Sequence, residues 1–552
     1  MKQWMRSGLP MIWLNAGALA ISLIAVFGLL ILIAVRGLSH FWPATVYEFN
    51  YVDPNGGDNI QLVGEIHSEE ILAPERLKAA GIAAPENMPE ITRYLLKVGN
   101  RDAYGIDFRQ VYEYGIKGER SIPRDMLVIE RHEWGNAYGQ LLKVYEKDQV
   151  VAEGPQAIGE LQTRLQRAID LHDRIKDIEK HEIGAINYDV EQLRLKQRRL
   201  ELDGDNTPER LAELDAERAR LAADYKVLED QLVELYVASK RDAFEIQIMD
   251  GRVRKIDVAN AVRIYQPNAM TTSEKVGFYF AKVWEFISDE PREANTEGGV
   301  FPAIFGTVMM VLIMAVIVTP FGVVAAVYLR EYAKQGPLTR VIRIAVNNLA
   351  GVPSIVYGVF GLGFFVYFLG GNIDELFYPE VKPAPVFGTP GIIWAALTLA
   401  ILTLPVVIVS TEEGLSRIPR ALREGSLALG ATKLETLWKV VLPMSSPAMM
   451  TGLVLAIARA AGEVAPLMLV GVVKLAPNLP LDGNAPFLHL DRKFMHLGFH
   501  IYDVGFQSPN VEAARPLVYA TSLLLVLVII ALNLTAIQIR NRLREKYRAL
   551  DQ

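Results

Sequence analysis

The chain contains no cysteine among its 552 residues, which excludes disulfide bonds, thiolate metal sites and thiol catalysis. It also lacks the phosphate-binding sequence G-x-x-x-x-G-K-[ST], so it carries no P-loop ATPase of its own. Its net charge of −6 is only mildly acidic and gives no indication of nucleic-acid binding. No serine nucleophile, carboxylate pair or cofactor motif stands out, and we therefore expect neither an enzyme nor a cofactor.

Long apolar runs dominate the sequence instead, and a run of about 18 or more such residues predicts a membrane-spanning helix. Five runs are uninterrupted, and a sixth contains only two charges, Arg459 and Glu463. The first run is too long for the core of a signal peptide and has no small-residue cleavage site before Arg36, so we interpret it as an uncleaved anchor. The six predicted spans are residues 8–35, 300–327, 344–369, 390–410, 447–473 and 516–539.

Lysine and arginine predict the orientation of these spans. They gather before the first span, between spans two and three, between spans four and five, and after span six, all on one side of a six-span chain. The opposite short loop, residues 370–389, contains a single lysine, Lys382. The positive-inside rule then predicts that both termini are cytoplasmic, and that residues 40–295 and 474–515 face outward.

Three regions follow from this pattern: an N-terminal span in residues 1–39, a polar insert in residues 40–295, and the remaining spans in residues 296–545. Within the insert, apolar steps of three and four mark two helices. In the first they run from Ile158 to Ile175 and resume from Ile186 to Leu193, and in the second they run from Leu211 to Leu235, broken only by Arg218. A turn containing Gly204 separates them, so residues 158–239 predict an antiparallel coiled-coil hairpin.

Strand-like segments flank this predicted hairpin. Residues 127–130 and 140–145 form one predicted β-hairpin, and residues 244–248 and 253–256 form another. The insert is therefore expected to be an α+β domain from which the coiled coil projects. We favour a structural or docking module, and the alternative is a sensor or a platform for a solute receptor.

Residues 412–443, between spans four and five, predict a short helix, a glycine turn and a second helix. Gly430 permits the positive φ that ends the first helix, and Pro443 marks the expected return toward the membrane. A compact element of this kind can insert as a rigid knob into a cleft of a partner protein.

This loop resembles the one that ATP-binding-cassette importer permeases carry, with the pattern E-A-A, three residues, G, nine residues, I-x-L-P. The spacing agrees throughout, and the departures are two small residues in place of the alanines and Val440 in place of isoleucine. The resemblance implies that this EAA loop couples the spans to a separate ATPase. The residues that carry the match are Glu424, Gly425, Ser426, Gly430, Leu442 and Pro443.

Two further stretches narrow the resemblance: N-N-L-A-G-V-P-S-I-V-Y-G-V-F-G-L at residues 347–362 and A-R-A-A-G-E-V-A-P-L at residues 458–467. Together they resemble the PstA-type permease of phosphate importers. The related PstC type shares much of this pattern, and the ending A-P-L favours PstA. The resemblance covers residues 300–545 and leaves out the insert.

The resemblance implies a six-helix, type I importer permease in a bacterial inner membrane. It also implies the partners of such a permease: a PstC-type paralogue, two PstB-type ATPase subunits that bind ATP, and a periplasmic PstS-type phosphate-binding protein. Alternatives remain open at this point. One is a permease for sulfate or molybdate, and another is a membrane signalling or scaffold protein that works through its coiled coil.

Arg459 and Glu463 are the candidate substrate-path residues. Each charge near the bilayer centre costs about 2.5–3.5 kcal/mol, whereas an exposed i,i+4 pair returns only about 0.2–0.5 kcal/mol. Stability alone therefore explains the pair poorly. A guanidinium presents a planar fork of donors to phosphate oxygens, and with the family resemblance we hypothesise that Arg459 lines the path and Glu463 positions it. The alternative is an ion pair that packs helices within the permease dimer.

Asn348 and Ser354 are candidate neutral donors near this path, although helix packing is the commoner role for such residues. His489, His496 and His500 have spacings of seven and four, which would allow one helical face and a metal site. We favour histidines of a solvated loop there, and we predict no metal.

Overall fold

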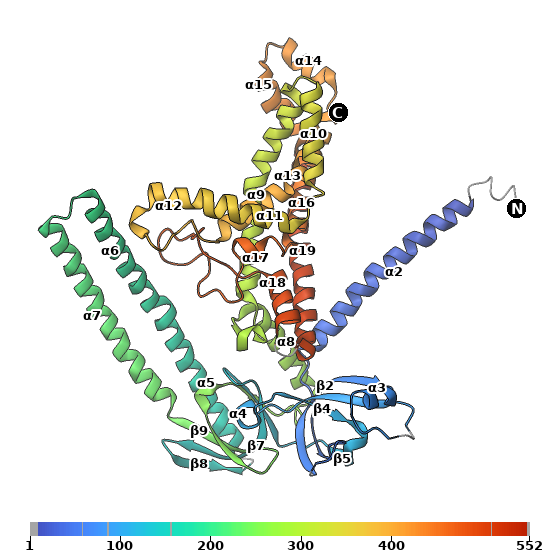
Figure 1. Cartoon of the computed structure of the whole chain (residues 1–552), viewed down its shortest axis with the longest axis vertical. Coiled ribbons are helices and arrows are strands. Elements are labelled where there is room, and N and C mark those ends of the chain that lie inside the picture. The colour runs from blue at the N-terminus through green and yellow to red at the C-terminus, as the bar shows by residue number, and fades with distance from the viewer. Residues whose placement is uncertain (1–8, 58, 86–87, 155–156, 509–510, 549–552) are drawn as a thin grey trace. The chain divides into compact units, whose positions relative to one another are not determined.

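The computed structural model describes residues 9–57, 59–85, 88–154, 157–508 and 511–548. Its contacts divide the chain into two compact units. We call Met1–His40 with Val300–Gln552 the membrane unit, and Phe41–Gly299 the insert unit. Figure 1 shows helices alone in the membrane unit, and strands together with helices in the insert unit.

Among its described residues, the membrane unit has six helices that are long and apolar enough to cross a bilayer, which confirms the predicted number of spans. They are Met11–Ser39, Phe301–Tyr332, Ser354–Phe377, Ile392–Arg417, Lys433–Gly462 and Ala514–Arg542. The elements of this unit are α2 (Leu9–Ser39), α9 (Phe301–Val327), η6 (Tyr328–Tyr332), α10 (Pro337–Leu349), α11 (Ser354–Phe360), η7 (Gly361–Gly370), α12 (Gly371–Phe377), η8 (Pro379–Val381), α13 (Ile392–Arg417), α14 (Arg420–Ala428), α15 (Lys433–Thr436), η9 (Leu437–Val441), α16 (Leu442–Gly462), α17 (Leu467–Val470), α18 (Leu497–Tyr502), η10 (Asp503–Gln507) and α19 (Val511–Arg548).

Two predicted spans have wrong boundaries. The third begins at Ser354 instead of residue 344, because α10 ends at Leu349, and the fifth ends at Gly462 instead of residue 473. Each of these helices ends four residues before a proline, Pro353 or Pro466. The reason is steric, because a proline ring clashes with the carbonyl four residues earlier and the proline supplies no N–H.

The core of the membrane unit lies between α9, α13 and α16. Met310, Met314 and Leu399 are fully buried there. Glycines let these helices approach closely: a Cβ on Gly322 would lie 2.5 Å from a methyl carbon of Val407. Such packing of small residues is typical of helix interfaces in membranes.

The insert unit contains two antiparallel sheets. The first has the strand order β4-β3-β2-β1-β5, and the second has the order β10-β9-β7-β6-β11, with β8 paired to β7. Both predicted β-hairpins are present in the second sheet, whereas the first sheet was not predicted strand by strand. The strands are β1 (Val46–Tyr51), β2 (Ile60–Leu72), β3 (Ile91–Lys97), β4 (Phe108–Tyr112), β5 (Ile116–Ser121), β6 (Met126–Arg131), β7 (Ala137–Glu146), β8 (Gln149–Glu153), β9 (Asp242–Gln247), β10 (Val253–Asp257) and β11 (Ala261–Tyr265), with a small pair, β12 (Pro291–Arg292) and β13 (Glu297–Gly298).

A long helical hairpin follows β8. It comprises α5 (Ala157–Asp177), η3 (Ile178–Glu182), α6 (Ile183–Asp203) and α7 (Pro208–Ser239), and Gly204 takes the positive φ of 72° at its tip (Figure 1). The apolar pattern is interrupted between Ile175 and Ile186, where the π-turn η3 lies, and a π-turn has more residues per turn and so changes the helical phase. The other helices of the unit are η1 (Glu113–Gly115), α3 (Pro74–Ala79), α4 (Arg101–Tyr104), η4 (Val258–Asn260), α8 (Thr272–Ser288) and η5 (Glu293–Asn295).

The predicted coiled-coil seam is wrong for its first part. Leu161 and Leu165 of α5 are buried in one core with Phe244 and Ile246 of the second sheet, so α5 is a helix of the domain body. Along α7, only Leu214 and Leu221 of the predicted seam are buried. The helical hairpin is therefore present, and coiled-coil packing between α6 and α7 stays a prediction.

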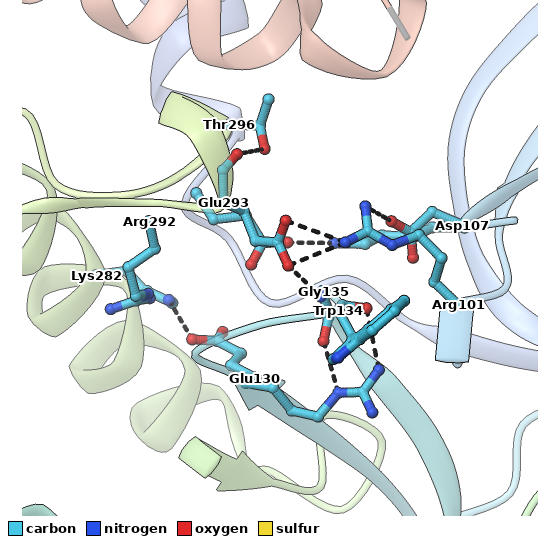
Figure 2. Close-up of polar contacts among 12 residues, drawn as sticks. Arg101, Asp107, Glu130, Trp134, Gly135, Lys282, Arg292, Glu293 and Thr296 are labelled. Carbon is cyan, nitrogen blue, oxygen red and sulfur yellow. Dashed lines mark hydrogen bonds and ion pairs between the residues drawn. The ribbon is translucent and has the colours of Figure 1, made fainter. Parts of the chain in front are cut away.

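Paired charges hold the end of the insert unit in place. Arg101 donates from Nη2 to both carboxylate oxygens of Glu293 at 3.1 Å, and the Gly135 N–H donates to the same carboxylate (Figure 2). Lys282 of α8 donates to Glu130 at 2.6 Å. The segment before the second span is thus fastened to the sheets rather than hanging as a free linker.

Two stacked histidines make the stability of the insert unit dependent on pH. The rings of His132 and His172 lie 4.1 Å apart. Burial, together with the nearby positive charges of His172, Arg292 and Lys176, lowers the pKa of His132 from 6.5 to about 4. Because the unfolded chain binds this proton at higher pH, the stabilising contribution is complete above pH ~6.5 and is lost as pH falls toward ~4.

Replacing His132 by phenylalanine keeps an aromatic ring and removes the titration. We expect the melting temperature of the full chain in detergent to fall less between about pH 7.5 and pH 5 in this variant than in the wild type. The Glu65 carboxyl, whose pKa burial raises to about 7, contributes with the opposite sign, so the difference between the two chains is the quantity to measure. Identical pH dependence in both would contradict the prediction.

Candidate functional site

Two broken helices of the membrane unit meet at one place. The first break lies between α10 and α11, and the second lies between α16 and α17, where Glu463 has an extended conformation. Gly358 of α11 packs directly on Pro466, since a Cβ there would lie 2.7 Å from the Pro466 Cα. The two stretches that carry the sequence resemblance are therefore neighbours in the fold. Irregular backbone at membrane depth is tolerated where protein buries it or where it lines a watery cavity, and interrupted helices often form binding sites.

Arg459 and Glu463 flank the second break. Arg459 lies in the last turn of α16, and its Nε is 3.6 Å from Oε1 of Glu463. Arg459 lies inside the helix, and Glu463 is the residue that follows its last residue, Gly462, so the pair spans the end of α16. The side chains retain exposures of 33% and 21%. A pair that is only partly buried leaves guanidinium donors free for another ligand.

The neutral candidates lie at the first break. Asn348 is exposed near the end of α10, and Ser354 is the half-buried first residue of α11. Within the described residues, neither side chain forms a hydrogen bond with Arg459 or Glu463. Tyr357, one turn into α11, donates its hydroxyl to the Leu349 carbonyl at 2.6 Å and so satisfies a backbone group that the break leaves open.

The three histidines of the segment before α19 have separate environments. His489 pairs with Asp482 at 2.9 Å, and Nδ1 of His496 accepts the Gly498 N–H at the start of α18. Burial lowers the pKa values of His496 and His500 to about 4. In the part of the chain that the structure describes, no group of three or more His, Asp or Glu side chains is arranged to hold a metal ion.

The predicted helix–turn–helix lies between α13 and α16 (Figure 1). The first helix is α14, and Gly430 takes a φ of 89° at the turn. Thr432 then caps α15, with its side chain and that of Glu435 forming a reciprocal capping box. The predicted return at Pro443 is wrong, since the helix runs without interruption from Lys433 to Gly462 and becomes the fifth span. Helix α15 is therefore the first part of the fifth span, and a movement of α15 would move that span.

Charges that sequence reasoning did not single out fasten this loop to the second span. Arg423 donates to Glu331 at 2.9 Å and to the Leu415 carbonyl at 2.8 Å. Lys433 donates to the Glu331 carbonyl at 2.6 Å. The only sequence signal was opposite charge in two short flanking segments, which does not specify pairing.

The same loop presents an apolar surface, although Glu424 and Gly425 are exposed and Ser426 turns inward to Thr436 at 2.9 Å. Leu429 is 91% exposed and Trp438 is 71% exposed. We call the exposed apolar residues Leu422, Leu427, Leu429, Leu434 and Trp438 the knob surface. Large exposed apolar patches are typical of sites that bind another protein.

Comparison with known proteins finds a family whose model matches part of the membrane unit. Residues 318–548 match the family model described as binding-protein-dependent transport system inner membrane component. The chain is 35% identical over 247 residues to phosphate transport system permease protein PstA 1 of Mycobacterium tuberculosis (strain CDC 1551 / Oshkosh), a match that covers 44% of this chain and 71% of that protein. It is 31% identical to the probable ABC transporter permease protein YqgI of Bacillus subtilis (strain 168), over 46% of this chain and 81% of that one.

A PstC permease of Xylella fastidiosa (strain 9a5c) is 32% identical, over 36% of this chain and 64% of that one. Among solved structures, the MetNI methionine ABC transporter in an inward-facing conformation matches with 19% identity and a TM-score of 0.33, over 44% of this chain and 94% of that one. A TM-score of this size carries no weight, and the assignment to a family therefore rests on the sequence matches.

Six membrane helices and the matched sequence define the class, a membrane permease of a binding-protein-dependent transport system. Such proteins are transport subunits and not enzymes. The chain belongs to the family of PstA-type transport system permeases. Its insert unit lies outside residues 318–548, which match the family model.

Proposed function

We propose that this chain is a permease subunit of an ATP-driven importer of inorganic phosphate. It would form the translocation path with a PstC-type paralogue, receive phosphate from a PstS-type binding protein, and be driven by two PstB-type ATPase subunits. The observation that carries the proposal is the partly exposed Arg459–Glu463 pair at a helix break, within the stretch of residues 458–467 that resembles phosphate permeases. The relatives named for phosphate transport support the same cargo.

The proposed mechanism is alternating access. ATP closure of the motor subunits would pull the knob surface, and the unbroken helix from Lys433 to Gly462 would carry that motion to Arg459 at its far end. Arg459 would hold the phosphate dianion through charge-assisted hydrogen bonds. Glu463 would then compete for the same guanidinium and limit how tightly the ion is held.

The proposed orientation puts the knob surface and both termini in the cytoplasm and the insert unit outside, because the flanking arginines and lysines lie on the knob side. The cargo is tested with membranes that contain the chain and its partners. Uptake of labelled phosphate should be displaced by unlabelled phosphate and not by equal sulfate or molybdate. Displacement by sulfate or molybdate would favour the alternative oxyanion permease.

The alternative function, a membrane scaffold or signalling protein, is tested by a deletion in the helical hairpin, and the structure shows which residues to delete. Deleting residues 158–239 would remove the buried Leu161 and Leu165 and unfold the insert unit, so it cannot separate the two functions. Tyr236 donates to Glu179 at 2.5 Å, so the two arms of the hairpin lie side by side there. We therefore remove residues 183–232 and join the arms with a short glycine–serine linker.

We expect this shorter deletion to leave phosphate uptake within about twofold of the wild type, because a surface hairpin can be removed where its ends are close. The longer deletion, 158–239, is the control, and it should abolish expression or uptake. Normal assembly with loss of uptake in the shorter deletion would make the hairpin the working part of the protein. That result would favour the scaffold or signalling function.

A further inference from the structure

Helix α8 of the insert unit has an apolar face that the described residues do not cover. The face consists of Val276, Phe280 and Trp284, spaced four residues apart and therefore on one side of the helix. Phe280 is 66% exposed and Trp284 is 70% exposed. Exposing an aromatic face of this kind to water is unfavourable in free energy, and contact with a partner surface would remove that cost.

The opposite face of α8 is firmly held. Phe286 is buried, and Phe278 packs on Tyr265 with ring centroids 4.6 Å apart. Lys282 donates to Glu130 at 2.6 Å (Figure 2), and Glu285 pairs with Arg292 at 2.8 Å. The helix therefore cannot roll to bury its outer face, and that face stays available to an external partner.

The chain brings the middle of α8 close to the end of the first span. The apolar run of that span ends before Arg36, and Trp42 follows six residues later. Three of these residues are helical, at about 1.5 Å each, and three more extend about 11 Å at most. Trp42 thus lies within ~15 Å of Arg36, the first residue after the apolar run. Its ring lies 6.2 Å from that of Tyr279 in α8.

The chain also brings the C-terminal end of α8 close to the start of the second span. After α8, strands β12 and β13 form a small hairpin that folds the chain back, and the Gly299 N–H donates to the Glu290 carbonyl at 3.1 Å. Gly299 is packed against the helix end, since a Cβ there would lie 2.3 Å from the Asp289 carbonyl oxygen. Phe301, two residues later, begins the second span.

We propose that α8 is an interfacial helix that lies on the bilayer, with Val276, Phe280 and Trp284 in the headgroup region of the leaflet from which the first two spans emerge. The first span ends three residues before Trp42, which contacts α8, and the second span begins two residues after Gly299, which packs on the end of α8, so the nearest apolar phase is lipid. Tryptophan and phenylalanine are the side chains that amphipathic interfacial helices insert. The contact would fix the height and tilt of the insert unit above the membrane, independently of the transported ion.

The absence of cysteine makes a direct test practical. Single-cysteine variants Phe280→Cys and Trp284→Cys carry a spin label in the full chain, reconstituted in phospholipid nanodiscs. Val233→Cys on α7, exposed and far from the spans in sequence, is the control. Accessibility is measured to oxygen, which concentrates in lipid, and to a water-soluble nickel complex.

We expect the oxygen-to-nickel accessibility ratio at positions 280 and 284 to exceed the ratio at position 233 severalfold, with or without partner subunits. Equal ratios at the three positions would overturn the proposal. Labels that are open to nickel in the isolated chain and closed to both reagents in the assembled complex would also overturn it, and would show that a protein subunit covers the face. Melting temperatures of the labelled variants confirm that each one is folded.

Discussion

Replacement of Arg459 by alanine is expected to lower phosphate uptake by about 10- to 100-fold, because a hydrogen bond to a charged group contributes about 1.5–3 kcal/mol. The guanidinium lies at the end of α16 and is partly free of Glu463, so its loss removes the proposed ligand for the anion. Replacement by lysine keeps the charge and loses the planar fork, and uptake should be intermediate. The measurement is the initial rate of labelled phosphate uptake at matched protein levels.

Arg340→Ala is the matched control, because Arg340 is an exposed arginine on α10, away from both helix breaks. It should transport at the wild-type rate. Co-purification of the ATPase subunits with each variant separates failed assembly from failed transport. Normal uptake by both Arg459→Ala and Arg459→Lys would remove the transport role and leave the pair as a helix-packing contact.

Replacement of Leu429 by aspartate is expected to reduce association with the ATPase subunits by about 30-fold or more, the effect of losing a contact worth about 2 kcal/mol. Leu429 is almost fully exposed at the tip of the knob surface, so the substitution does not disturb the core of the permease. A charge placed in an apolar interface is left desolvated and unpaired. The measurement is the amount of ATPase subunit that co-purifies with the tagged chain in detergent.

Leu481→Asp is the control, since Leu481 is also exposed but lies in the segment between α17 and α18. It should co-purify with the ATPase as the wild type does. If Leu429→Asp retains the ATPase as well, the knob surface is not the site of coupling, and the proposed mechanism fails. The role of Arg459 in the ion path is a separate prediction, which the uptake measurement on the Arg459 variants tests.

Local sequence was sufficient for the spans, the helical hairpin and the glycine turn at residue 430. An apolar run of bilayer length has few alternatives to a helix, because every backbone group must be satisfied internally. Gly204 and Gly430 take positive φ values that other residues rarely adopt, so the turns at these two glycines can also be predicted from the sequence. The two β-hairpins of the second sheet followed from their alternation and turn residues.

The sequence by itself determined which segments enter the membrane and which class of permease the chain belongs to. Only the tertiary structure decided which prolines break a helix: Pro353 and Pro466 do, whereas Pro320 and Pro405 lie inside helices. It also decided that α5 packs on a sheet, that Arg423 pairs with Glu331, and that the two breaks meet. The physical reason is that a span is stabilised by its own composition, whereas a break or a charge pair depends on neighbours that are distant in sequence.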